Sequence, residues 1–257
     1  MDWSTKRKLT YLSILLLVIL VVAAYFLYPL FIENPTCSDG KQNGDEVGVD
    51  CGGICNNFCA SQVRPLSIIW QRSFEVAPGI YDVLGYVENQ NADAGVSSLL
   101  YRFKLYDDKN VLIAERDGKT FIGPNQSGAI FSGGINTGER IPKLVYLEFE
   151  DYQWTKIDPR FLKINFSVKN QQLLNASTSP RLAVSVGNES LTDLRNVEAA
   201  AILRDQDDNA IAVSNTVIES LPKQSSKDIF FTWLTPLELP VARIEIIPRV
   251  NPFTVSY

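Results

Sequence analysis

Residues 98–117, SLLYRFKLYDDKNVLIAERD, form a pattern of two β-strands joined by a polar turn. Leucine, aromatic and β-branched side chains fill the two arms, and Asp, Lys and Asn fill the link between them. Phe103 and Leu105 are two residues apart, so their side chains point to one face of the strand and are expected in the core. Asp107 begins the turn, where its carboxylate can accept hydrogen bonds from the backbone that follows. The stretch therefore predicts a β-hairpin with a structural motif at its centre.

Similar patterns of strands and turns continue in both directions along the sequence from this hairpin. From Leu66 onward, runs such as IYDVLGYVEN, KLVYLEFE and RLAVSVGN alternate with turn clusters rich in Gly, Asn, Asp and Pro. Short strands at this spacing are typical of antiparallel sandwiches rather than of parallel α/β folds. The sequence therefore predicts a mainly β fold in which two tandem Ig-like antiparallel sandwiches occupy residues 63–156 and 157–257.

The two halves also match each other in sequence. At an offset of 98 residues the matched pairs are Leu105 with Leu203, Asp107 with Asp205, Ile113 with Ile211, Pro124 with Pro222, Gln126 with Gln224 and Pro142 with Pro240. In addition, Asn89 and Asn188 each end the expected second strand of their half. This internal similarity predicts a duplication of one sandwich unit.

The run Phe103-Lys104-Leu105-Tyr106-Asp107 resembles the signature of the FxLYD domain family, small Ig-like sandwiches of envelope and surface proteins. The preceding strand, GYVEN at 85–89, fits the G-x-V-x-N pattern typical of that family. The second half, with AILRD at 201–205, keeps only the Leu and the Asp. The resemblance implies a fold and carries no general catalytic assignment.

Residues 33–62 form a turn-rich segment that holds all four cysteines of the chain: Cys37, Cys51, Cys55 and Cys59. In an oxidising compartment two disulfides are expected, and the sequence leaves the three possible pairings open. A four-thiolate zinc site is the alternative, but the spacing lacks the C-x2-C pairs that such sites usually have. The run CSDGKQNGDEVGVDCGGIC at 37–55 resembles a short cysteine-rich motif of microbial surface proteins, which favours an extracytoplasmic location.

The same segment carries oxygen-bearing side chains that raise a weak calcium hypothesis, with Asp39, Asn43, Asp45 and Asp50 as the candidate ligands. The spacing is not that of an EF-hand loop. Asp and Asn are also the residues that make turns, so a purely structural role is the competing interpretation.

An apolar stretch, LTYLSILLLVILVVAAYFLYPLFI at 9–32, precedes the cysteine segment. As a helix it would be about 36 Å long, enough to cross the hydrocarbon core of a bilayer. Lys6, Arg7 and Lys8 lie on its N-terminal side, so the positive-inside rule predicts a cytoplasmic N-terminus (residues 1–8) and an external body at the cytoplasmic membrane. The alternative is a signal peptide cleaved after Val22-Ala23-Ala24, although the apolar run continues beyond that site.

Composition narrows the range of functions. The chain contains no histidine, which excludes His-dependent catalysis and His-ligated zinc. Of 24 basic and 29 acidic residues, three basic and one acidic precede the apolar stretch, which leaves the rest with a net charge of −7. An acidic body disfavours nucleic acid as a partner.

Several further groups of residues could be read as functional sites, but ordinary structural roles explain most of them. The acidic runs at 107–108 and 205–209 coincide with expected turns. In Ser225-Ser226-Lys227, adjacent residues of a strand point to opposite faces, so their closeness in sequence is poor evidence for a Ser-Lys dyad. Trp70, Trp154 and Trp233 are expected in cores or strand pairs. Four Asn-x-Ser sequons would be glycosylation acceptors in an exported protein: Asn125, Asn165, Asn175 and Asn188.

The sequence as a whole therefore predicts a membrane-anchored envelope protein without catalytic residues or cofactors. Its expected partners are the membrane, through Leu9–Ile32, and an envelope protein bound in a scaffolding or interaction role. A calcium- or glycan-binding adhesin is the alternative.

Overall fold

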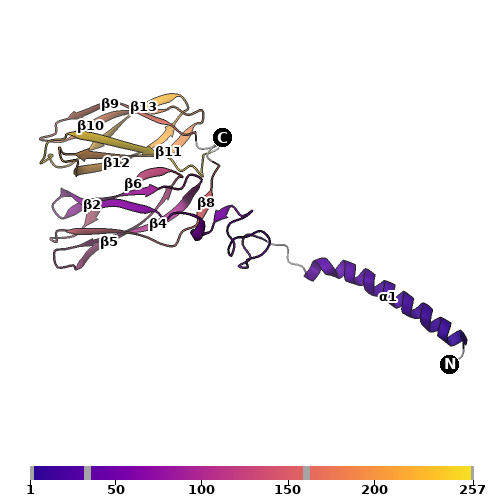
Figure 1. Cartoon of the computed structure of the whole chain (residues 1–257). Helices are drawn as coiled ribbons and strands as arrows, with labels where there is room; N and C mark the ends of the chain where they lie inside the picture. Colours follow the sequence, from indigo (N-terminus) through magenta and orange to yellow (C-terminus); the bar gives the residue numbers. More distant parts are fainter. Residues whose placement is uncertain (1–2, 32–35, 159–162, 256–257) are drawn as a thin grey trace. The chain divides into compact units, whose positions relative to one another are not determined.

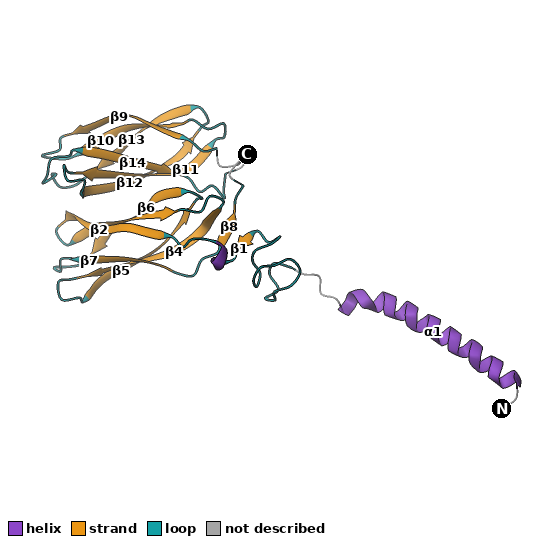
Figure 2. Cartoon of the chain, in the orientation of Figure 1, coloured by secondary structure: helices purple, strands orange, loops and turns teal. Residues whose placement is uncertain are grey.

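The structure is a computed structural model that describes residues 3–31, 36–158 and 163–255. The chain divides into two compact units, Met1–Cys55 and Asn56–Tyr257. The predicted fold class is confirmed, because one N-terminal helix is followed by a chain that is mainly antiparallel β-sheet (Figure 2).

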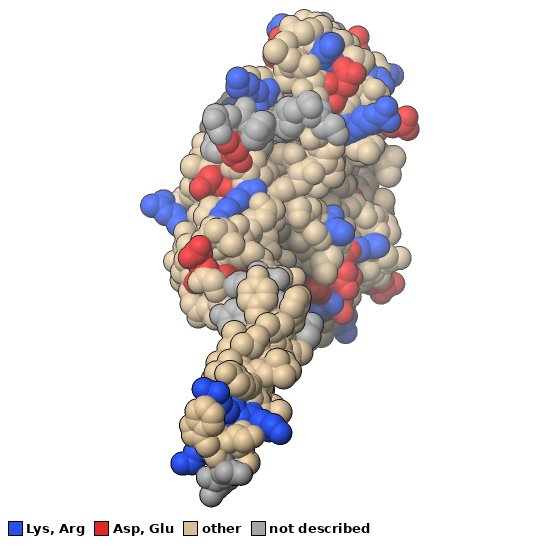
Figure 3. Space-filling view, turned by 90° about the vertical axis from the view of Figure 1, so that its right-hand side faces the viewer, with Lys and Arg blue, Asp and Glu red and all other residues tan. Residues whose placement is uncertain are grey.

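The first unit contains the helix α1 (Trp3–Phe31). Its stretch Trp3–Leu27 is long and apolar enough to cross a membrane, and none of its most apolar window is buried in the protein. Basic side chains gather at its N-terminal end, while the rest of the helix is uncharged (Figure 3). Of the stretch expected to span the membrane, Ile32 lies outside the described residues.

The cysteine segment of the first unit is held by local cross-links instead of an apolar core. Cys37 is disulfide-bonded to Cys55, 18 residues further on. Cys51 and Cys59 are disulfide-bonded as well, and no described cysteine is free, so the disulfide prediction is confirmed. A left-handed Gly53 makes this folding possible, because a Cβ there would lie 1.7 Å from the carbonyl oxygen of Asp45.

The second unit begins with a sandwich built from two sheets. One sheet has the order β1-β8-β4-β5, with β7 also paired to β4, and the other has the order β2-β3-β6. The strands are β1 (Asn57–Phe58), β2 (Ser67–Ala77), β3 (Ile80–Asn89), β4 (Ala94–Tyr106), β5 (Leu112–Ile122), β6 (Gln126–Asn136), β7 (Leu144–Phe149) and β8 (Trp154–Lys156), with a short 3-10 helix, η1 (Ala60–Gln62). Asn57 and Phe58, which belong to the segment 33–62 by sequence, pair with Thr155 and Trp154 and so extend this sheet.

The second sandwich follows the same plan with six strands. Its sheets have the orders β12-β11-β14 and β13-β10-β9. The strands are β9 (Phe166–Leu174), β10 (Arg181–Asn188), β11 (Leu194–Arg204), β12 (Ala210–Leu221), β13 (Ser225–Thr232) and β14 (Arg243–Arg249). Each sandwich encloses its own core of alternating inward side chains, with Phe103 in the first and Phe231 in the second.

Corresponding hairpins of the two sandwiches share their pairing. Leu105 pairs with Ala114, and Leu203 pairs with Ala212, so both members of the second pair lie 98 residues after their counterparts in the first. A break in register follows at the same place in each hairpin. In the other sheet, Asn89 pairs with Gln126 and Asn188 with Ser225, now 99 residues apart. The counterpart of Gln126 is therefore Ser225, one residue beyond the Gln224 that the sequence offset suggested.

A third apolar cluster joins the two sandwiches. Phe74, Leu84 and Ala129 of the sheet β2-β3-β6 pack against residues of the sheet β12-β11-β14. The members contributed by that second sheet are Ala200, Ile202, Ala210 and Val213. The four sheets consequently form four stacked layers within one compact unit (Figure 1). The small side chains of β11 and β12 that take part in this cluster carry no pattern in the sequence that predicts the contact.

Candidate functional site

The FxLYD-like motif forms part of the core and of a turn. Phe103 and Leu105 are fully buried in the first sandwich. Tyr106 points the other way and makes an edge-to-face contact with Tyr146, with ring centroids 5.6 Å apart. The buried part of the motif therefore has no surface with which to bind a ligand.

Asp107 closes the turn that follows. Its Oδ1 accepts hydrogen bonds from the backbone amides of Lys109 and Val111, each at 2.9 Å, and Arg140 lies 3.5 Å from Oδ2. The Val111 amide is the main reason why the pKa of this carboxyl lies below its usual value. Asn110 takes the left-handed conformation that the turn requires.

The second half repeats this turn in detail. Asp205 Oδ1 accepts hydrogen bonds from the backbone amides of Asp207 (3.0 Å) and Asn209 (2.8 Å), and Asp208 is left-handed. Burial works against ionisation of Asp205, but these amides, led by that of Asn209, hold its pKa below the usual value. In both acidic runs noted in the sequence, the first Asp therefore accepts hydrogen bonds from the backbone of a turn.

The calcium candidates of the cysteine segment mostly accept hydrogen bonds from nearby amides. Asp50 accepts from the amides of Asp39 and Gly40, and Asp39 accepts from the amide of Lys41 and the side chain of Asn43. Asp45 is exposed. Asn43 Oδ1 is a buried acceptor without a hydrogen-bond partner among the described residues. Calcium binding at this place stays a prediction.

The same segment brings two cysteine sulfurs close to a carboxylate. Cys37, Glu46 and Cys55 offer ligand atoms within 4.8 Å of one another. Cys37 and Cys55 are bonded to each other, however, so neither sulfur is a thiolate ligand.

The four sequon asparagines differ in their exposure to solvent. Asn188 is 1% exposed, and its amide group donates to the carbonyls of Thr192 and Leu221, which makes this sequon inaccessible in the folded chain. The other three sequon asparagines are exposed: Asn125, Asn165 and Asn175. Ser225 Oγ donates to the carbonyl of Pro222, 2.7 Å away, and is engaged in turn structure.

A buried charge connects the two sandwiches. Arg249 of β14 is 7% exposed and lies 2.6 Å from Glu198 of β11. The same guanidinium donates to Thr120 Oγ1 of the first sandwich at 2.8 Å. Arg204 pairs with Glu245 at 2.9 Å. The Arg249–Thr120 hydrogen bond joins the two sandwiches, whereas both ion pairs lie within the second sandwich, and no local sequence pattern indicates any of these contacts.

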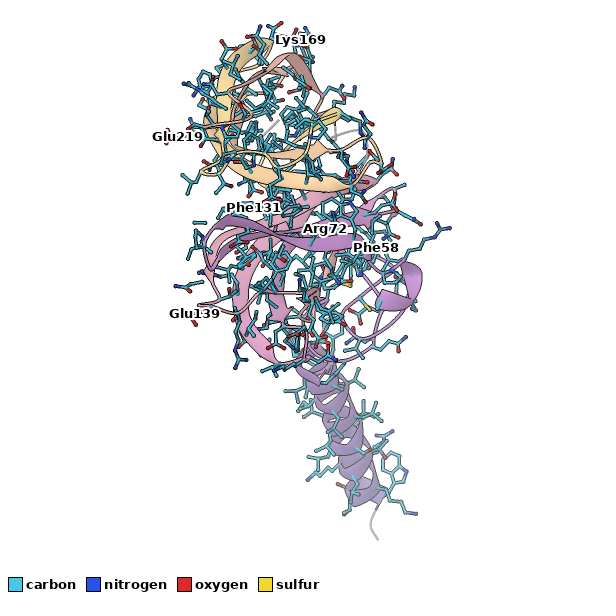
Figure 4. All side chains as sticks on the ribbon, turned by 90° about the vertical axis from the view of Figure 1, so that its left-hand side faces the viewer. Phe58, Arg72, Phe131, Glu139, Lys169 and Glu219 are labelled. Atoms are coloured by element: carbon cyan, nitrogen blue, oxygen red, sulfur yellow. A yellow bond between two sulfur atoms is a disulfide. The ribbon has the colours of Figure 1, made fainter. Side chains whose placement is uncertain are left out.

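A groove of about 700 Å³ lies beside this interface, and we call it the inter-sandwich groove. It is lined by residues 72–78 on β2 and the turn after it, 210–213 on β12, Trp233, and 235–239 on the loop before β14. Most of the lining is apolar, including Phe74, Ile211 and Leu237. Leu239 is half exposed at 51%. Figure 4 shows Arg72, which also lines the groove, at the boundary between the two sandwiches.

Two walls of the groove are the outer strands of their sheets. Both β2 and β12 stand at the end of a strand order, so each has one edge without a strand neighbour. Side chains cap β12, because the carbonyl of Ala210 accepts from Arg72 Nη1 and that of Val213 accepts from Trp233 Nε1, both at 2.8 Å. Among the described residues, no side chain hydrogen-bonds to the backbone of β2.

The arrangement suits binding more than chemistry. An apolar groove with a few polar groups and an open strand edge is a common site for a peptide or a small ligand. Of the sequence candidates, the groove contains only Trp233, and that side chain forms part of the wall. Sequence reasoning missed the rest because the lining comes from segments up to 167 residues apart.

Comparisons with known proteins add little. The chain matches no protein-family model and no curated protein sequence. Among solved structures, the crystal structure of red sea bream transglutaminase is similar at a TM-score of 0.25 and 8% sequence identity. That match covers 72% of this chain and 29% of the transglutaminase, and a likeness this weak carries no argument about fold or activity.

Proposed function

We propose that this chain is a single-pass membrane protein that displays a non-catalytic interaction module outside the cell, where it holds a partner protein of the envelope. The observation that carries the proposal is the inter-sandwich groove, whose walls come from both sandwiches. Such a site exists only while the two sandwiches are held together, and the shared apolar cluster and the buried Arg249–Thr120 hydrogen bond hold them.

The anchor and its orientation are part of the same proposal. α1 can span a bilayer, and its basic residues lie at the N-terminal end, which the positive-inside rule assigns to the cytoplasm. The disulfide-bonded cysteines after the helix fit an oxidising exterior. The body would then work at the outer face of the cytoplasmic membrane.

We further propose that the two sandwiches are copies of one FxLYD-like unit. The shared hairpin registers and the matching turns at Asp107 and Asp205 support a common origin. The buried amides of Asn89 and Asn188 add a third match, because each donates to two backbone carbonyls at the end of the corresponding strand. In this family the motif specifies a fold, so the function must lie in surfaces such as the groove.

Site-specific photo-crosslinking in intact cells tests the proposed function. A photoreactive residue in place of Leu239, at the rim of the groove, should give a discrete protein adduct. The same residue in place of Glu219, an exposed position toward the other end of β12, should give none. Adducts from both positions, or from neither, would contradict a groove-specific partner.

A further inference from the structure

We propose that the inter-sandwich groove receives an extended peptide segment, which pairs with the open edge of β2 and alternates apolar with basic side chains. The inference rests on the proposed function and names the chemistry of its partner. Four features of the groove lead to it.

The first feature is the difference between the two edges. Capping by Arg72 and Trp233 protects the β12 edge from strand pairing. The nearby edge strand β7 is capped too, because the amide of Leu147 donates to Gln71 Oε1 at 2.7 Å. The β2 edge has no such cap among the described residues, and residues 72–77 of this strand line the groove. Unpaired backbone amides and carbonyls in that position are the template for strand addition.

The second feature is size. The groove, at about 700 Å³, lies in the range of cavities that bind drug-sized ligands or short peptides. Residues 72–77 of an extended strand span roughly 20 Å. A segment of about six residues would therefore match the open edge in length.

The third feature is the difference between the two sides of β2. Trp70 and Phe74 face the second sandwich and pack in the apolar cluster between the sandwiches. Gln71 faces the other way, toward β7. Side chains of an added strand would alternate in the same manner. Those on the side of the second sandwich would meet Ile211 and Leu239 and should be apolar.

The fourth feature is charge. Glu75 and Glu238 line the groove, and the one basic residue of the lining, Arg72, already donates to the carbonyl of Ala210. Among the described residues Glu238 forms no ion pair. The alternate side chains of the ligand should therefore be Lys or Arg, which point to the side of Glu75, while Glu238 adds negative charge at the rim of the groove.

The test uses the full chain in lipid nanodiscs and three fluorescent peptides, with anisotropy as the readout. The first peptide alternates Lys with Val and Leu over seven residues, the second replaces each Lys by Glu, and the third carries N-methyl groups on alternate amides of the first. The first should bind in a saturable manner, and each of the others about tenfold or more weakly, since one loses charge complementarity and the other loses backbone pairing. Equal binding of the first and third peptides would overturn strand addition.

Matched variants locate the binding. Leu239→Ala should weaken the basic peptide severalfold, and Glu238→Lys should weaken it while strengthening the acidic peptide. Glu219→Lys, the same charge change on the far part of β12, should leave both unchanged. Both groove residues are on the surface, so melting temperatures should stay equal.

The failure of this inference can be told apart from failure of the proposed function. If no peptide binds but Leu239 still crosslinks to a partner in cells, the groove is used by something other than an extended basic segment. If peptide binding is insensitive to both groove variants, the groove is not the site and the inference is wrong.

Discussion

Single residues of the FxLYD-like motif act through packing and turn geometry. Phe103 is fully buried in the first core, and Asp107 holds the hairpin turn through two backbone amides. Both roles followed from sequence, because alternation along a strand and the turn preference of Asp are local properties. The role of Arg249 did not follow, since its contacts with Thr120 and Phe121 join positions nearly 130 residues apart.

The buried ring of Phe103 provides the first prediction. Phe103→Ala should lower the free energy of unfolding by about 3–5 kcal/mol, because the ring leaves a cavity in the core. Tyr106→Ala, which removes the outward ring of the same motif, should cost about 1 kcal/mol. Urea denaturation of the two variants measures both values, and similar losses would show that burial does not explain the motif.

The lowered pKa of Asp107 provides a prediction about pH. Its folded-state pKa lies below the unfolded value of about 3.9. The carboxylate therefore stabilises the fold above the unfolded value, and this contribution disappears as the pH falls through the folded pKa. Asp107→Asn should lower the melting temperature at pH 7, and the gap to the unmodified chain should narrow below pH 4. The exposed Asp108→Asn serves as the control, and a gap that stays constant with pH would count against the ionised turn.

At the scale of strands, sequence patterns predicted most of the fold. Period-two alternation and Gly/Asn/Asp turns marked the strands of both sandwiches, and the offset of 98 residues anticipated the shared register of β4–β5 and β11–β12. The offset missed the one-residue shift in the other sheets, because loop lengths differ between the halves. The hydrogen bonds that cap strand edges could not be predicted either, because the side chains of Gln71, Arg72 and Trp233 bond to the backbone of strands distant in sequence.

The ion pair between β14 and β11 can be tested at this scale. Arg249→Met should cost about 2–3 kcal/mol, since it leaves Glu198 and Thr120 without their cation while Glu198 keeps partial contact with water. Adding Glu198→Gln should restore part of the loss, because no charge is then left unpaired. A double-mutant cycle measures the coupling, and additive effects would show that the pair does not act as a unit.

For the molecule as a whole, topology decides whether the body can meet an external partner. Because the basic residues lie on one side of α1, protease added to intact cells should digest the body and spare the N-terminus. A body that is protected until the membrane is opened would contradict the orientation. A mature N-terminus at Tyr25 would show instead that the helix is a cleaved signal.

The central claim is that the two sandwiches behave as one body, since the proposed binding groove exists only between them. Scanning calorimetry of the full chain in lipid nanodiscs tests it most directly. The shared apolar cluster and the buried Arg249–Thr120 hydrogen bond predict one unfolding transition with an enthalpy of about 140 kcal/mol, matched by the van't Hoff value for the whole unit. Two transitions, each with about half of that enthalpy, would show that the sandwiches unfold independently and would contradict the account.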